Sequence, residues 1–596
     1  LQEHPDVVDV IPHPHLCSEA GLALIEESLA GKGLGAVLVA ACAHDLYDVA
    51  FRPIMKKAEL GPGQTVNLDL RVSSSRNENV KARTGHSVDR ALALLDRLEL
   101  PSDELGSALE EADDGVVRRA LVIGGGIGGI QAALDIANSG HEVVLVERQP
   151  SIGGHMIQLS ETFPSLDCSQ CILTPKMAEV GRHPKIRLLT TSEVTGLEGR
   201  LGRFTAKIER KPRYVLDSCT ACGDCVDACP VLVCDQFNTG LRWRKAIYQP
   251  FPQAVPSIFA LDDEHCLGLF PLACGKCEQV CEPGSIDYDM QPVTEEIEVG
   301  AVVVATGYEM YSYGDVSEYG YGKYDDVING LQFERLLSAS GPTMGKVIRP
   351  SDGKEPKEVV FIQCVRSRNP ERGKPYCSGI CCMYTAKHAL LLRHKVPESR
   401  AYIFYMDIRA GGKGYEEFVH RAMEEERVMY IRGRPGQIIE EDGKLKVLGV
   451  DTLSGRTVEI DADMVVLAAA MEPADHGEIA GKLRIAADTD GFFKEAHPKL
   501  RPVETLTAGI FLAGTAQAPK DIPDTVSQAS AAASKGLEML SREFLERDPS
   551  TAHVNESACA GCFECLEVCP YGAIERKELL DAQGEVFREV AAPNPA

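Results

Sequence analysis

LVIGGGIGG, at Leu121–Gly129, is a short apolar strand that runs into a glycine-rich turn, and it decides the fold of the surrounding chain. Gly124, Gly126 and Gly129 have the spacing G-x-G-x-x-G. In a βαβ unit the first glycine permits a tight turn, the second lets the backbone approach a pyrophosphate, and the third lets the helix pack on the strand. The stretch therefore predicts a dinucleotide-binding site at a helix N-terminus.

The flanking sequence completes this unit. We expect a strand at Ala120–Ile123, a helix at Ile130–Ser139 and a second strand at His141–Val146. An acidic residue about 20 positions after the turn binds a ribose hydroxyl in such units. Glu147 stands at that position, so strand, turn, helix, strand and acid together predict a βαβ dinucleotide-binding unit in an α/β fold.

Three later pieces favour a flavin over a nicotinamide. Ser151–Gly154 (SIGG) is a second glycine turn, and Ala301–Gly307 (AVVVATG) is a strand that ends in ATG. Thr507–Thr515 (TAGIFLAGT) resembles the strand that closes over the flavin in flavoproteins with two dinucleotide-binding domains. Lys520 follows as a candidate cation near the flavin, although a solvated loop lysine explains it equally well. The expected FAD-binding residues are Gly124, Gly126, Gly128, Gly129, Glu147, Arg148, Gly153, Gly154, Thr306, Gly307, Gly514, Thr515 and Lys520.

Composition narrows the class of protein. The chain has 596 residues and a formal net charge of −26, which argues against nucleic-acid binding because that needs basic patches. No apolar run reaches the roughly 18 residues of a membrane span, and we see no signal peptide. The 21 cysteines are clustered. Clustered thiols in a chain without a signal peptide predict a reducing cytoplasm.

The clearest metal-binding pattern begins at residue 219. Cys219, Cys222, Cys225 and Cys229–Pro230 give C-x2-C-x2-C-x3-C-P, the bacterial ferredoxin run. In a two-cluster ferredoxin the fourth cysteine of each run binds the other cluster. The second half is Cys266, Cys274, Cys277 and Cys281, so Cys281 is expected to complete the first cluster and Cys229 the second. Zinc is the weaker alternative, and Cys234 is a spare cysteine expected to be structural.

A second set of cysteines occupies a strand–helix junction. Lys357–Gln363 is expected to be a strand and Met383–Arg393 a helix, as in a second Rossmann-like domain. The glycine turn that would bind NAD(P) is missing between them. The loop instead holds Cys364, Cys377, Cys381 and Cys382, which predicts a cluster at the vacated site, with a chance grouping of core cysteines as the alternative.

Other cysteines leave alternatives open. Cys559, Cys562, Cys565 and Cys569–Pro570 repeat the ferredoxin run. Either Cys569 is the fourth ligand or a second half is missing, and we favour the missing half because the motif sends that cysteine to a neighbouring cluster. Cys168 and Cys171 form a C-x-x-C that is a redox dithiol, half of a cluster site or an inert pair.

The N-terminal region carries weaker signals. Gly21–Leu29 and Val88–Leu98 have helical patterns, and Ala36–Ala41 is a buried strand, which together predict a small α/β domain. Cys17 and Cys42 beside these elements are more simply core residues than ligands. The acidic stretch Ser102–Gly115 is expected to be a linker.

Four segments in order carry a resemblance to a known family: GGGIGGIQAALDIANSGHEVVLVER, FPSLDCSQCILTPKMAEVGRHP, CTACGDCVDACP and YCSGICCMYTAKHA. They closely resemble the A subunit of heterodisulfide reductase, a flavin and iron–sulfur protein known from methanogens and found in other anaerobes. The resemblance covers nearly the whole chain, and DCSQCILTPKM and CSGICCM are specific to it.

The resemblance implies a thioredoxin-reductase-like FAD core with two dinucleotide-binding domains and [4Fe–4S] clusters. It implies two clusters in the inserted domain, one in the second Rossmann-like domain and at least one in the C-terminal domain. The ligands carried over are Cys219, Cys222, Cys225, Cys229, Cys266, Cys274, Cys277, Cys281, Cys364, Cys377, Cys381, Cys382, Cys559, Cys562, Cys565 and Cys569.

The family also implies flavin-based electron bifurcation in a cytoplasmic complex. Its expected partners are a cysteine-rich reductase subunit, a small iron–sulfur subunit, ferredoxin, an electron-input module linked to a hydrogenase or formate dehydrogenase, and a second copy of this chain. Two departures stand out. Family members have further N-terminal cysteines, one of them where this chain reads NLDLRVSSS, which leaves an N-terminal cluster open. The C-terminal ferredoxin region lacks a second motif.

The expected domains alternate between flavin and cluster modules. They are an N-terminal α/β domain (1–115), FAD segments (116–212, 293–350 and 491–548), an inserted ferredoxin domain (213–292), the second Rossmann-like domain (351–490) and an incomplete C-terminal ferredoxin domain (549–596). Two other functions compete with bifurcation. One is a non-bifurcating flavin relay linked to a quinone or another acceptor, and the other is an NAD(P)H:ferredoxin-type flavoenzyme, against which the cysteine-filled loop argues.

Overall fold

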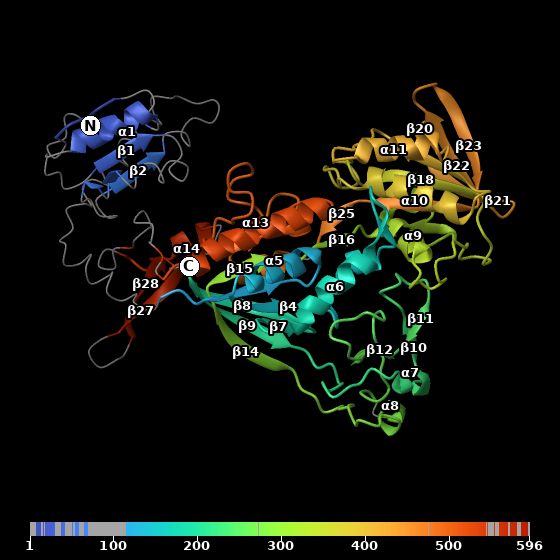
Figure 1. Ribbon diagram of the computed structural model, residues 1–596, viewed down its shortest axis with the longest axis horizontal. Coiled ribbons are helices and arrows are strands. Elements are labelled where there is room, and N and C mark those ends of the chain that lie inside the picture. Colours follow the sequence, from blue (N-terminus) through green and yellow to red (C-terminus); the bar gives the residue numbers. More distant parts are fainter. Residues whose placement is uncertain are drawn as a thin grey trace. The chain divides into compact units, whose positions relative to one another are not determined.

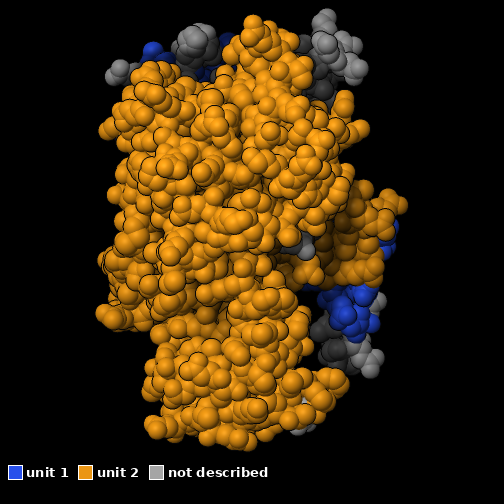
Figure 2. Space-filling view, turned by 90° about the vertical axis from the view of Figure 1, so that its right-hand side faces the viewer, with its two compact units in different colours: residues 1–115, 544–562, 577–593 blue, residues 116–543, 563–576, 594–596 orange. Residues whose placement is uncertain are grey.

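The computed structural model describes residues 115–543 except 272 and 475, together with parts of both ends of the chain. These parts are 8–12, 16, 18–29, 37–41, 51, 54–55, 57–58, 65–69, 545, 554, 559–569, 573–580 and 586–593. Contacts divide the chain into one unit of residues 1–115, 544–562 and 577–593 and a larger unit of residues 116–543, 563–576 and 594–596 (Figure 2). The predictions for Cys17, Cys42, Val88–Leu98 and the linker up to residue 114 lie outside the described residues.

The larger unit contains a five-stranded parallel sheet drawn from three distant parts of the chain (Figure 1). Its order is β26 (Ile510–Leu512), β15 (Ala301–Val304), β3 (Arg119–Ile123), β4 (Glu142–Val146) and β7 (Ile186–Leu189). Helix α5 (Ile127–Asn138) follows the glycine turn, and α13 (Ile522–Leu540) packs against it. The strand, turn, helix and strand expected around Leu121–Gly129 are therefore present.

Alternate side chains of β3 face two different layers. Ala120 and Val122 pack in the core formed with α5 and α13. Leu121 and Ile123 pack against an antiparallel sheet of β8 (Ser192–Arg200), β9 (Arg203–Arg210) and β14 (Val293–Val299). Because successive strand side chains point to opposite faces, a strand covered on both faces is apolar throughout.

A second five-stranded parallel sheet repeats this construction. Its order is β17 (Val327–Asn329), β24 (Met464–Ala469), β18 (Glu358–Val365), β19 (Arg400–Tyr405) and β20 (Met429–Arg432). One face carries the helices α9 (Gly330–Leu337), α10 (Cys381–Lys395) and α11 (Tyr415–Glu424). The other face carries the antiparallel strands β21 (Gln437–Glu441), β22 (Lys444–Asp451) and β23 (Arg456–Ala462). The predicted α/β class is confirmed.

This second sheet begins earlier in the chain than we expected. β17 pairs with β24, and α9 packs on the same sheet, although we assigned residues 293–350 to the FAD domain. The expected boundary at residue 351 is therefore too late. β17 has only three residues, which is too few to show a hydrophobic period, and its partner strand lies more than a hundred residues away in sequence.

The inserted cysteine region leaves the core between two neighbouring strands. β9 and β14 are antiparallel, and Arg210 pairs with Val293. Since the chain leaves and re-enters at adjacent points, the insertion can fold beside the core without breaking this pair. It contains α7 (Asp224–Ala228), β10 (Leu232–Cys234), β11 (Trp243–Lys245), β12 (Ile247–Tyr248), β13 (Ala260–Leu261) and α8 (Lys276–Gln279).

Short elements connect the layers of the larger unit. They are the 3-10 turn Met156–Gln158, the hairpin β5 (Glu161–Thr162) and β6 (Asp167–Cys168), α6 (Ser169–Arg182), the pair β16 (Tyr308–Met310) and β25 (Met471–Pro473), the 3-10 turns Tyr313–Asp315 and Ser317–Tyr319, α12 (His476–Leu483), and the 3-10 turn Gly514–Ala516.

The two ends of the chain carry smaller elements. The N-terminal part has α1 (Glu19–Leu29) and the parallel strands β1 (Val37–Ala41) and β2 (Thr65–Asp69), so the helix and strand expected there are present. The C-terminal part has α14 (Glu564–Val568), β27 (Ile574–Leu580) and β28 (Val586–Pro593). No helix within the described residues is long and apolar enough to cross a membrane.

We predict that Gly129→Ala destabilises the larger unit. A Cβ at Gly129 would lie 1.8 Å from the Gly124 carbonyl oxygen, so α5 would have to move away from β3. The free energy of unfolding should fall by about 2–3 kcal/mol, the cost of overpacking a rigid site. The measurement is urea denaturation followed by circular dichroism.

Gly481→Ala is the matched control. Gly481 also lies in a helix, and no atom would come within 4 Å of its added Cβ. This substitution should leave the urea midpoint of unfolding unchanged or raise it, because alanine is a better helix former than glycine. Equal stability of the two variants would contradict the tight packing at Gly129.

Candidate functional site

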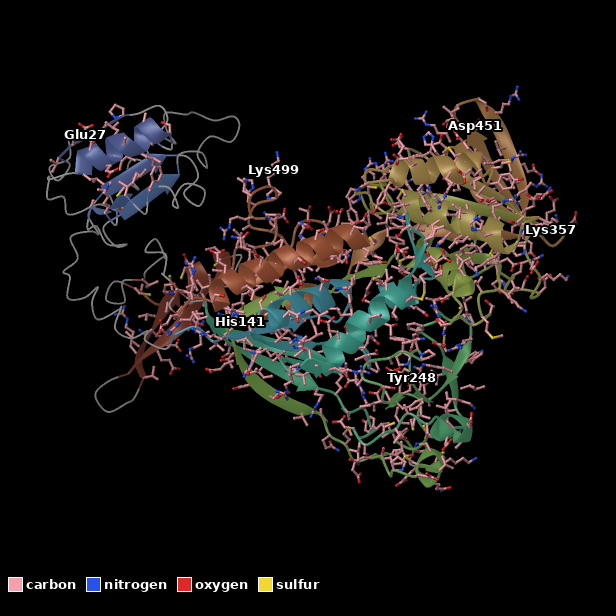
Figure 3. The ribbon with its side chains drawn as sticks, viewed as in Figure 1. Glu27, His141, Tyr248, Lys357, Asp451 and Lys499 are labelled. Carbon is pink, nitrogen blue, oxygen red and sulfur yellow. A yellow bond between two sulfur atoms is a disulfide. The ribbon has the colours of Figure 1, made fainter. Side chains whose placement is uncertain are left out.

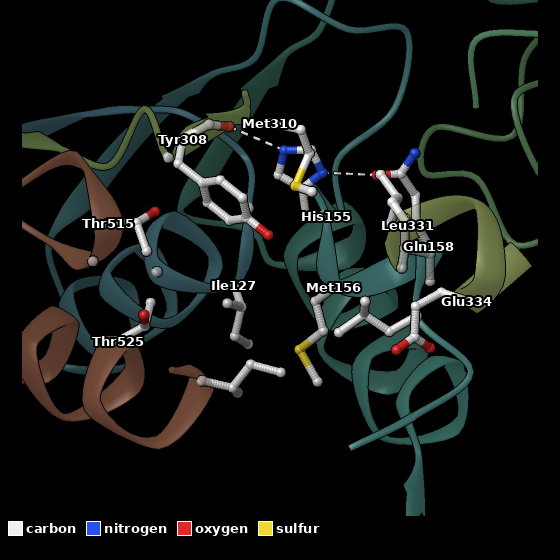
Figure 4. Close-up of a pocket in the computed structure, with 18 of the residues that line it drawn as sticks. Ile127, His155, Met156, Gln158, Tyr308, Met310, Leu331, Glu334, Thr515 and Thr525 are labelled. Carbon is white, nitrogen blue, oxygen red and sulfur yellow. Dashed lines mark hydrogen bonds between the residues drawn. The ribbon is translucent and has the colours of Figure 1, made fainter. Parts of the chain in front are cut away.

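A cavity of about 430 Å³ lies at the carboxyl ends of the first sheet. Residues that follow β3, β4, β15 and β26 line it, which is the usual ligand position in parallel α/β sheets. Figure 4 shows Thr515 and Thr525 on one side and Glu334 on the other. The lining includes these residues expected from the sequence: Gly124, Gly126, Gly128, Glu147, Arg148, Gly154, Thr306, Gly307, Gly514, Thr515 and Lys520.

The glycines form a cradle that side chains would fill. Gly124 has a φ of +104°, and a Cβ there would lie 2.3 Å from the Ala305 carbonyl oxygen. A Cβ at Gly154 would lie 2.9 Å from the Gly126 Cα, so the two glycine turns touch. Gly129 and Gly153 are not in the lining, and they shape the wall by close packing instead. Gly126 caps α5 without a side-chain hydrogen bond, which leaves the helix N-terminus available for phosphate.

Glu147 is buried at the edge of this cradle. Its Oε2 accepts from the Gly125 N–H at 2.7 Å and its Oε1 from the Gln149 N–H at 2.8 Å. Burial raises the pKa of this carboxyl, while the two backbone hydrogen bonds act in the opposite direction. The carboxylate thus holds the glycine turn and still has lone pairs for a ribose hydroxyl.

Two expected cations have protein partners. Lys520 Nζ donates to the carbonyl oxygens of Gly514 at 2.6 Å and Ala518 at 2.8 Å, and burial lowers the pKa of this lysine to about 8. Arg148 forms an ion pair with Glu309 at 3.0 Å. Both residues line the cavity, and Lys520 is a part-buried lysine that fixes its own loop, which excludes the solvated-loop alternative.

Sequence reasoning missed His155 and Tyr308 in the cavity wall. His155 Nε2 lies 3.0 Å from the Tyr308 carbonyl oxygen and Nδ1 lies 2.8 Å from Gln158 Oε1 (Figure 4). The two rings lie 4.5 Å apart between centroids. Each residue directly follows a predicted glycine, Gly154 or Gly307, so its position beside a glycine turn was the available signal.

The inserted domain also reaches the cavity. Phe237, Arg244, Tyr248 and Phe251 are among the lining residues. The Arg244 guanidinium carbon lies 3.6 Å from the centroid of the Tyr248 ring, which is labelled in Figure 3. Phe251 also packs in the core of the first sheet. The insertion is therefore fixed against the cavity rather than tethered beside it.

The far wall holds a buried charge cluster that the sequence did not predict. Glu334 Oε1 accepts from Lys387 Nζ and from His388 Nε2, and its Oε2 accepts from the Ser160 N–H at 3.0 Å and the Ser160 hydroxyl at 2.8 Å. Glu334, Lys387 and His388 all line the cavity. Burial alone would raise the pKa of Glu334, but Lys387 and His388 hold it well below its usual range.

His388 in this cluster is best described as neutral. Burial lowers its pKa, so at neutral pH Lys387 is the cation that balances Glu334. With Nε2 donating to Glu334, the Nδ1 lone pair is buried and has no hydrogen-bond partner among the described residues. An unpaired acceptor in a cavity wall is a site where a ligand can donate a hydrogen bond.

Three cysteines meet beside this cluster. Cys364 at the end of β18 and Cys381 and Cys382 at the start of α10 form one buried group, against which Tyr384 packs. Tyr384 also lines the cavity, and its buried hydroxyl has no hydrogen-bond partner among the described residues. One turn of α10 therefore separates the cysteines from the cavity wall.

Cys377 is less buried than these three cysteines, and its Sγ accepts from the Gly379 N–H at 3.4 Å. The hydrogen bond to Asp407 is the main cause that raises the pKa of Arg368, and Cys364 and Cys377 act in the same direction. The Arg409 N–H donates to Cys382 Sγ at 3.4 Å. Backbone donors to sulfur stabilise thiolates and cluster sulfides, so the junction suits a cluster.

The inserted domain draws cysteines of both its halves together. A small cavity is lined by Cys219, Cys222, Cys225 and Cys281. This is the set expected when the fourth cysteine of each run binds the cluster of the other run. Burial, followed by the neighbouring thiols, raises the pKa of Cys225 to about 12. The gathering of these four cysteines around one small cavity suits a [4Fe–4S] cluster, whose iron atoms bind thiolates.

In the second half, burial raises the pKa of Cys277, and the thiols of Cys266 and of Cys229 from the first half act in the same direction. The Cys277 Sγ is 3.0 Å from the Tyr288 hydroxyl oxygen. Cys234 is exposed, so it does not have the buried structural place that we expected for it. No group of His, Cys, Asp or Glu within the described residues is arranged to hold a single metal ion. That finding concerns single ions, whereas each thiolate of a cubane binds a different iron.

Family models match two parts of the chain. Residues 120–169 match the model "FAD dependent oxidoreductase", and residues 551–574, which include Cys559, Cys562, Cys565 and Cys569, match "4Fe-4S binding domain". The glycine cradle, the buried carboxylate and the cavity fit a flavin nucleotide. Fold and site thus define an FAD-dependent iron–sulfur oxidoreductase that forms part of a larger enzyme.

Curated relatives give the family. The A subunit of the H(2):CoB-CoM heterodisulfide,ferredoxin reductase of Methanothermobacter marburgensis is 44% identical over 579 residues, 96% of this chain and 86% of that protein. The second A-type iron–sulfur subunit of the CoB--CoM heterodisulfide reductase of Methanopyrus kandleri is 47% identical over 579 residues, 96% and 87% of the two chains. The A subunit of the H(2)/formate:CoB-CoM heterodisulfide,ferredoxin reductase of Methanococcus maripaludis is 44% identical over 572 residues, 95% and 85%. The chain belongs to the family of heterodisulfide reductase A subunits.

Among solved structures, thioredoxin reductase of Lactococcus lactis aligns with 71% of this chain and 99% of its own. The identity is 16% and the TM-score 0.40. We take the fold from the strand order rather than from this likeness.

The crossed cysteine arrangement predicts how double variants lose clusters. Cys219→Ala with Cys281→Ala removes two ligands of one cluster, so one cluster should be lost. Cys219→Ala with Cys277→Ala removes a ligand from each, so both should be lost. Iron and acid-labile sulfide analysis measures the loss, and Cys234→Ala should lose nothing. Loss of both clusters in both double variants would show that each run holds its own cluster.

We predict that Glu334→Gln lowers the free energy of unfolding at pH 7 by about 3 kcal/mol, because it leaves the Lys387 charge buried without a counter-ion. The pKa of Glu334 is depressed in the folded state. Glu334 therefore contributes to the free energy of unfolding at every pH above about 4.3, the ordinary pKa of a glutamate, and this contribution is lost only as the pH falls below that value.

The difference in free energy of unfolding between Glu334→Gln and the parent protein should thus be constant between about pH 6 and pH 8. Glu309→Gln is the matched control, since it removes only the half-exposed pair with Arg148 and should cost less than about 1 kcal/mol. Equal effects of the two substitutions in thermal or urea denaturation would contradict the buried ion pair.

Proposed function

We propose that this chain is the flavin-based electron-bifurcating subunit of a heterodisulfide reductase-like complex. The FAD would lie in the cavity between the glycine cradle and Glu334, held by the residues expected from the sequence, on a thioredoxin-reductase-like core. The domain order would be that given above, with the second Rossmann-like domain starting near β17. The clusters would number two in the inserted domain, one beside α10 and at least one in the C-terminal region.

The cavity suggests how the FAD is oriented. A pyrophosphate at the N-terminus of α5 and a ribose at Glu147 direct the flavin ring toward Lys387 and His388. The Lys387 charge would then favour electron density on the ring, and His388 Nδ1 could accept a hydrogen bond from it. When bound, FAD supplies the ability to take electrons in a pair and release them singly.

The position of helix α10 is the main observation that supports this proposal. Its first residues are the cysteines Cys381 and Cys382, and its next turn carries Tyr384, Lys387 and His388 in the cavity wall. A ligand in the cavity and a cluster at the helix start would be separated by one side-chain layer. Arg244 and Tyr248 bring the inserted domain to the same cavity, which suggests a second exit for electrons.

The names of two relatives support the choice of partners. The names of the Methanothermobacter and Methanococcus proteins specify hydrogen or formate as electron donor, and heterodisulfide and ferredoxin as acceptors. We propose the same classes here, in the cytoplasm: a hydrogenase- or formate dehydrogenase-linked module, a cysteine-rich reductase subunit, a small iron–sulfur subunit, ferredoxin and a second copy of this chain. NAD(P)H fits less well, because the loop after β18 holds cysteines where a phosphate cradle would be.

Potentiometry of the assembled complex tests bifurcation. Bifurcation requires that the second electron released be far more reducing than the first. The flavin should therefore pass directly from its oxidised to its two-electron-reduced absorption spectrum. A stable organic radical, detected by electron paramagnetic resonance over a wide range of potential, would contradict bifurcation and favour the non-bifurcating relay.

A Cys381→Ala variant tests the cluster beside α10, and Cys234→Ala is its matched control. By iron and sulfide analysis, Cys381→Ala should keep its FAD and lose one cluster. Cys234→Ala should keep its FAD and all its clusters. Retention of every cluster in Cys381→Ala would overturn the assignment at α10.

A further inference from the structure

Cys168 and Cys171 form a disulfide, the one such bond among the described residues. Both cysteines are exposed, and neither lines the cavity. The other described cysteines are free thiols, and all but Cys234 belong to the predicted cluster sites. Within the part of the chain that the structure describes, this pair is therefore separate from the cavity and from the predicted cluster sites.

The pair sits where one thiolate is stabilised. Cys168 is the N-cap of the 14-residue helix α6, and the Cys171 N–H donates to Cys168 Sγ at 3.2 Å. A backbone donor and the positive end of a helix dipole both favour a thiolate over a thiol. Asp167 is the adjacent charged side chain, and its Oδ2 accepts from the Ser165 hydroxyl at 2.5 Å. Cys168 is therefore the better nucleophile of the two.

The two residues between the cysteines are anchored to the body of the protein. The Ser169 hydroxyl donates to the Met156 carbonyl oxygen at 2.6 Å, and Gln170 Nε2 donates to the Ser340 hydroxyl at 2.5 Å. The Ser169 N–H also donates to the Ser160 carbonyl oxygen at 3.1 Å. These contacts hold the two sulfurs in reach of each other when the bond between them is broken.

The sulfurs face solvent from the outer side of a hairpin. β6 ends at Cys168, which pairs across the hairpin with Glu161 of β5, and Glu161 is a lining residue of the cavity. The Glu161 carbonyl oxygen accepts from Lys387 Nζ at 2.7 Å. The hairpin thus separates the disulfide from the cavity, so electrons for this pair would come from outside the chain.

We propose that Cys168–Cys171 is a thiol–disulfide exchange site for an external dithiol. One thiolate of the dithiol attacks Cys168 Sγ, the bond between Cys168 and Cys171 breaks, and Cys171 leaves as a thiolate that takes up a proton. The second thiolate of the dithiol then attacks the dithiol's own sulfur in the mixed disulfide and releases Cys168 as a thiolate, which takes up the second proton. Two electrons and two protons pass to the pair, and the external dithiol becomes a disulfide.

The first test uses the unaltered full-length protein. It is equilibrated anaerobically with dithiothreitol at graded ratios of reduced to oxidised form, quenched in acid and alkylated, and the peptide 165–176 is quantified by mass spectrometry. The expected result is one reversible two-electron transition from disulfide to dithiol, at the same ratio with and without FAD. A pair that stays oxidised in excess dithiothreitol while the protein is folded, or stays reduced at every ratio, would overturn the proposal.

A different midpoint with and without FAD would also overturn it, because the electrons would then be shared with the flavin. Neither outcome bears on bifurcation, since no cluster ligand or cavity residue is changed.

The second test asks which thiol is the better nucleophile, because the same sulfur forms the mixed disulfide in both directions of the exchange. Cys171→Ala and Cys168→Ala are compared in a Cys234→Ala background, which removes the exposed spare thiol, with 5,5′-dithiobis(2-nitrobenzoic acid) as the probe. The thiol of Cys168 in the first variant should react about tenfold faster than that of Cys171 in the second. Equal rates, or a faster Cys171, would contradict the assignment of Cys168.

Discussion

The close approach of backbone to backbone at the glycine turn is the constraint on which the rest of this molecule depends. A Cβ at Gly129 would overlap the Gly124 carbonyl oxygen, and one at Gly124 would overlap that of Ala305. Only glycines allow β3, β15 and α5 to converge so tightly. The convergence leaves free N–H groups and an open space at the carboxyl ends of four strands, and that space is the cavity.

At the opposite wall, Glu334 holds three parts of the chain together. It binds Ser160, which directly precedes β5, and Lys387 and His388 of α10. A buried carboxylate is costly unless paired and fully hydrogen-bonded, and here every bond crosses between elements. The cavity is thus closed by the same contacts that dock the two parallel sheets, so ligand site and domain arrangement share one set of interactions.

Helix α10 links that closure to the cysteines. In a nicotinamide-binding domain the corresponding turn would be a phosphate cradle, and here it is a buried group of Cys364, Cys381 and Cys382. Cysteines in place of a glycine loop change what this turn can bind, from a nucleotide phosphate to a cluster. The strand β18 before the turn and the helix α10 after it are retained. The insertion between β9 and β14 adds a second set of cysteines by a similarly local change, because its ends meet on adjacent strands.

Local sequence by itself determined the βαβ unit at Leu121–Gly129, the later strands at Ala301 and Ile510, and the cysteine runs. Each depends on residues only a few positions apart, where spacing expresses the geometry directly. Only the tertiary structure revealed the short strand β17, the cavity residues His155 and Tyr308, and the cluster of Glu334, Lys387 and His388. These residues act through partners that are distant in sequence, and a single buried Glu, Lys or His has no periodic pattern that would distinguish it from a surface residue.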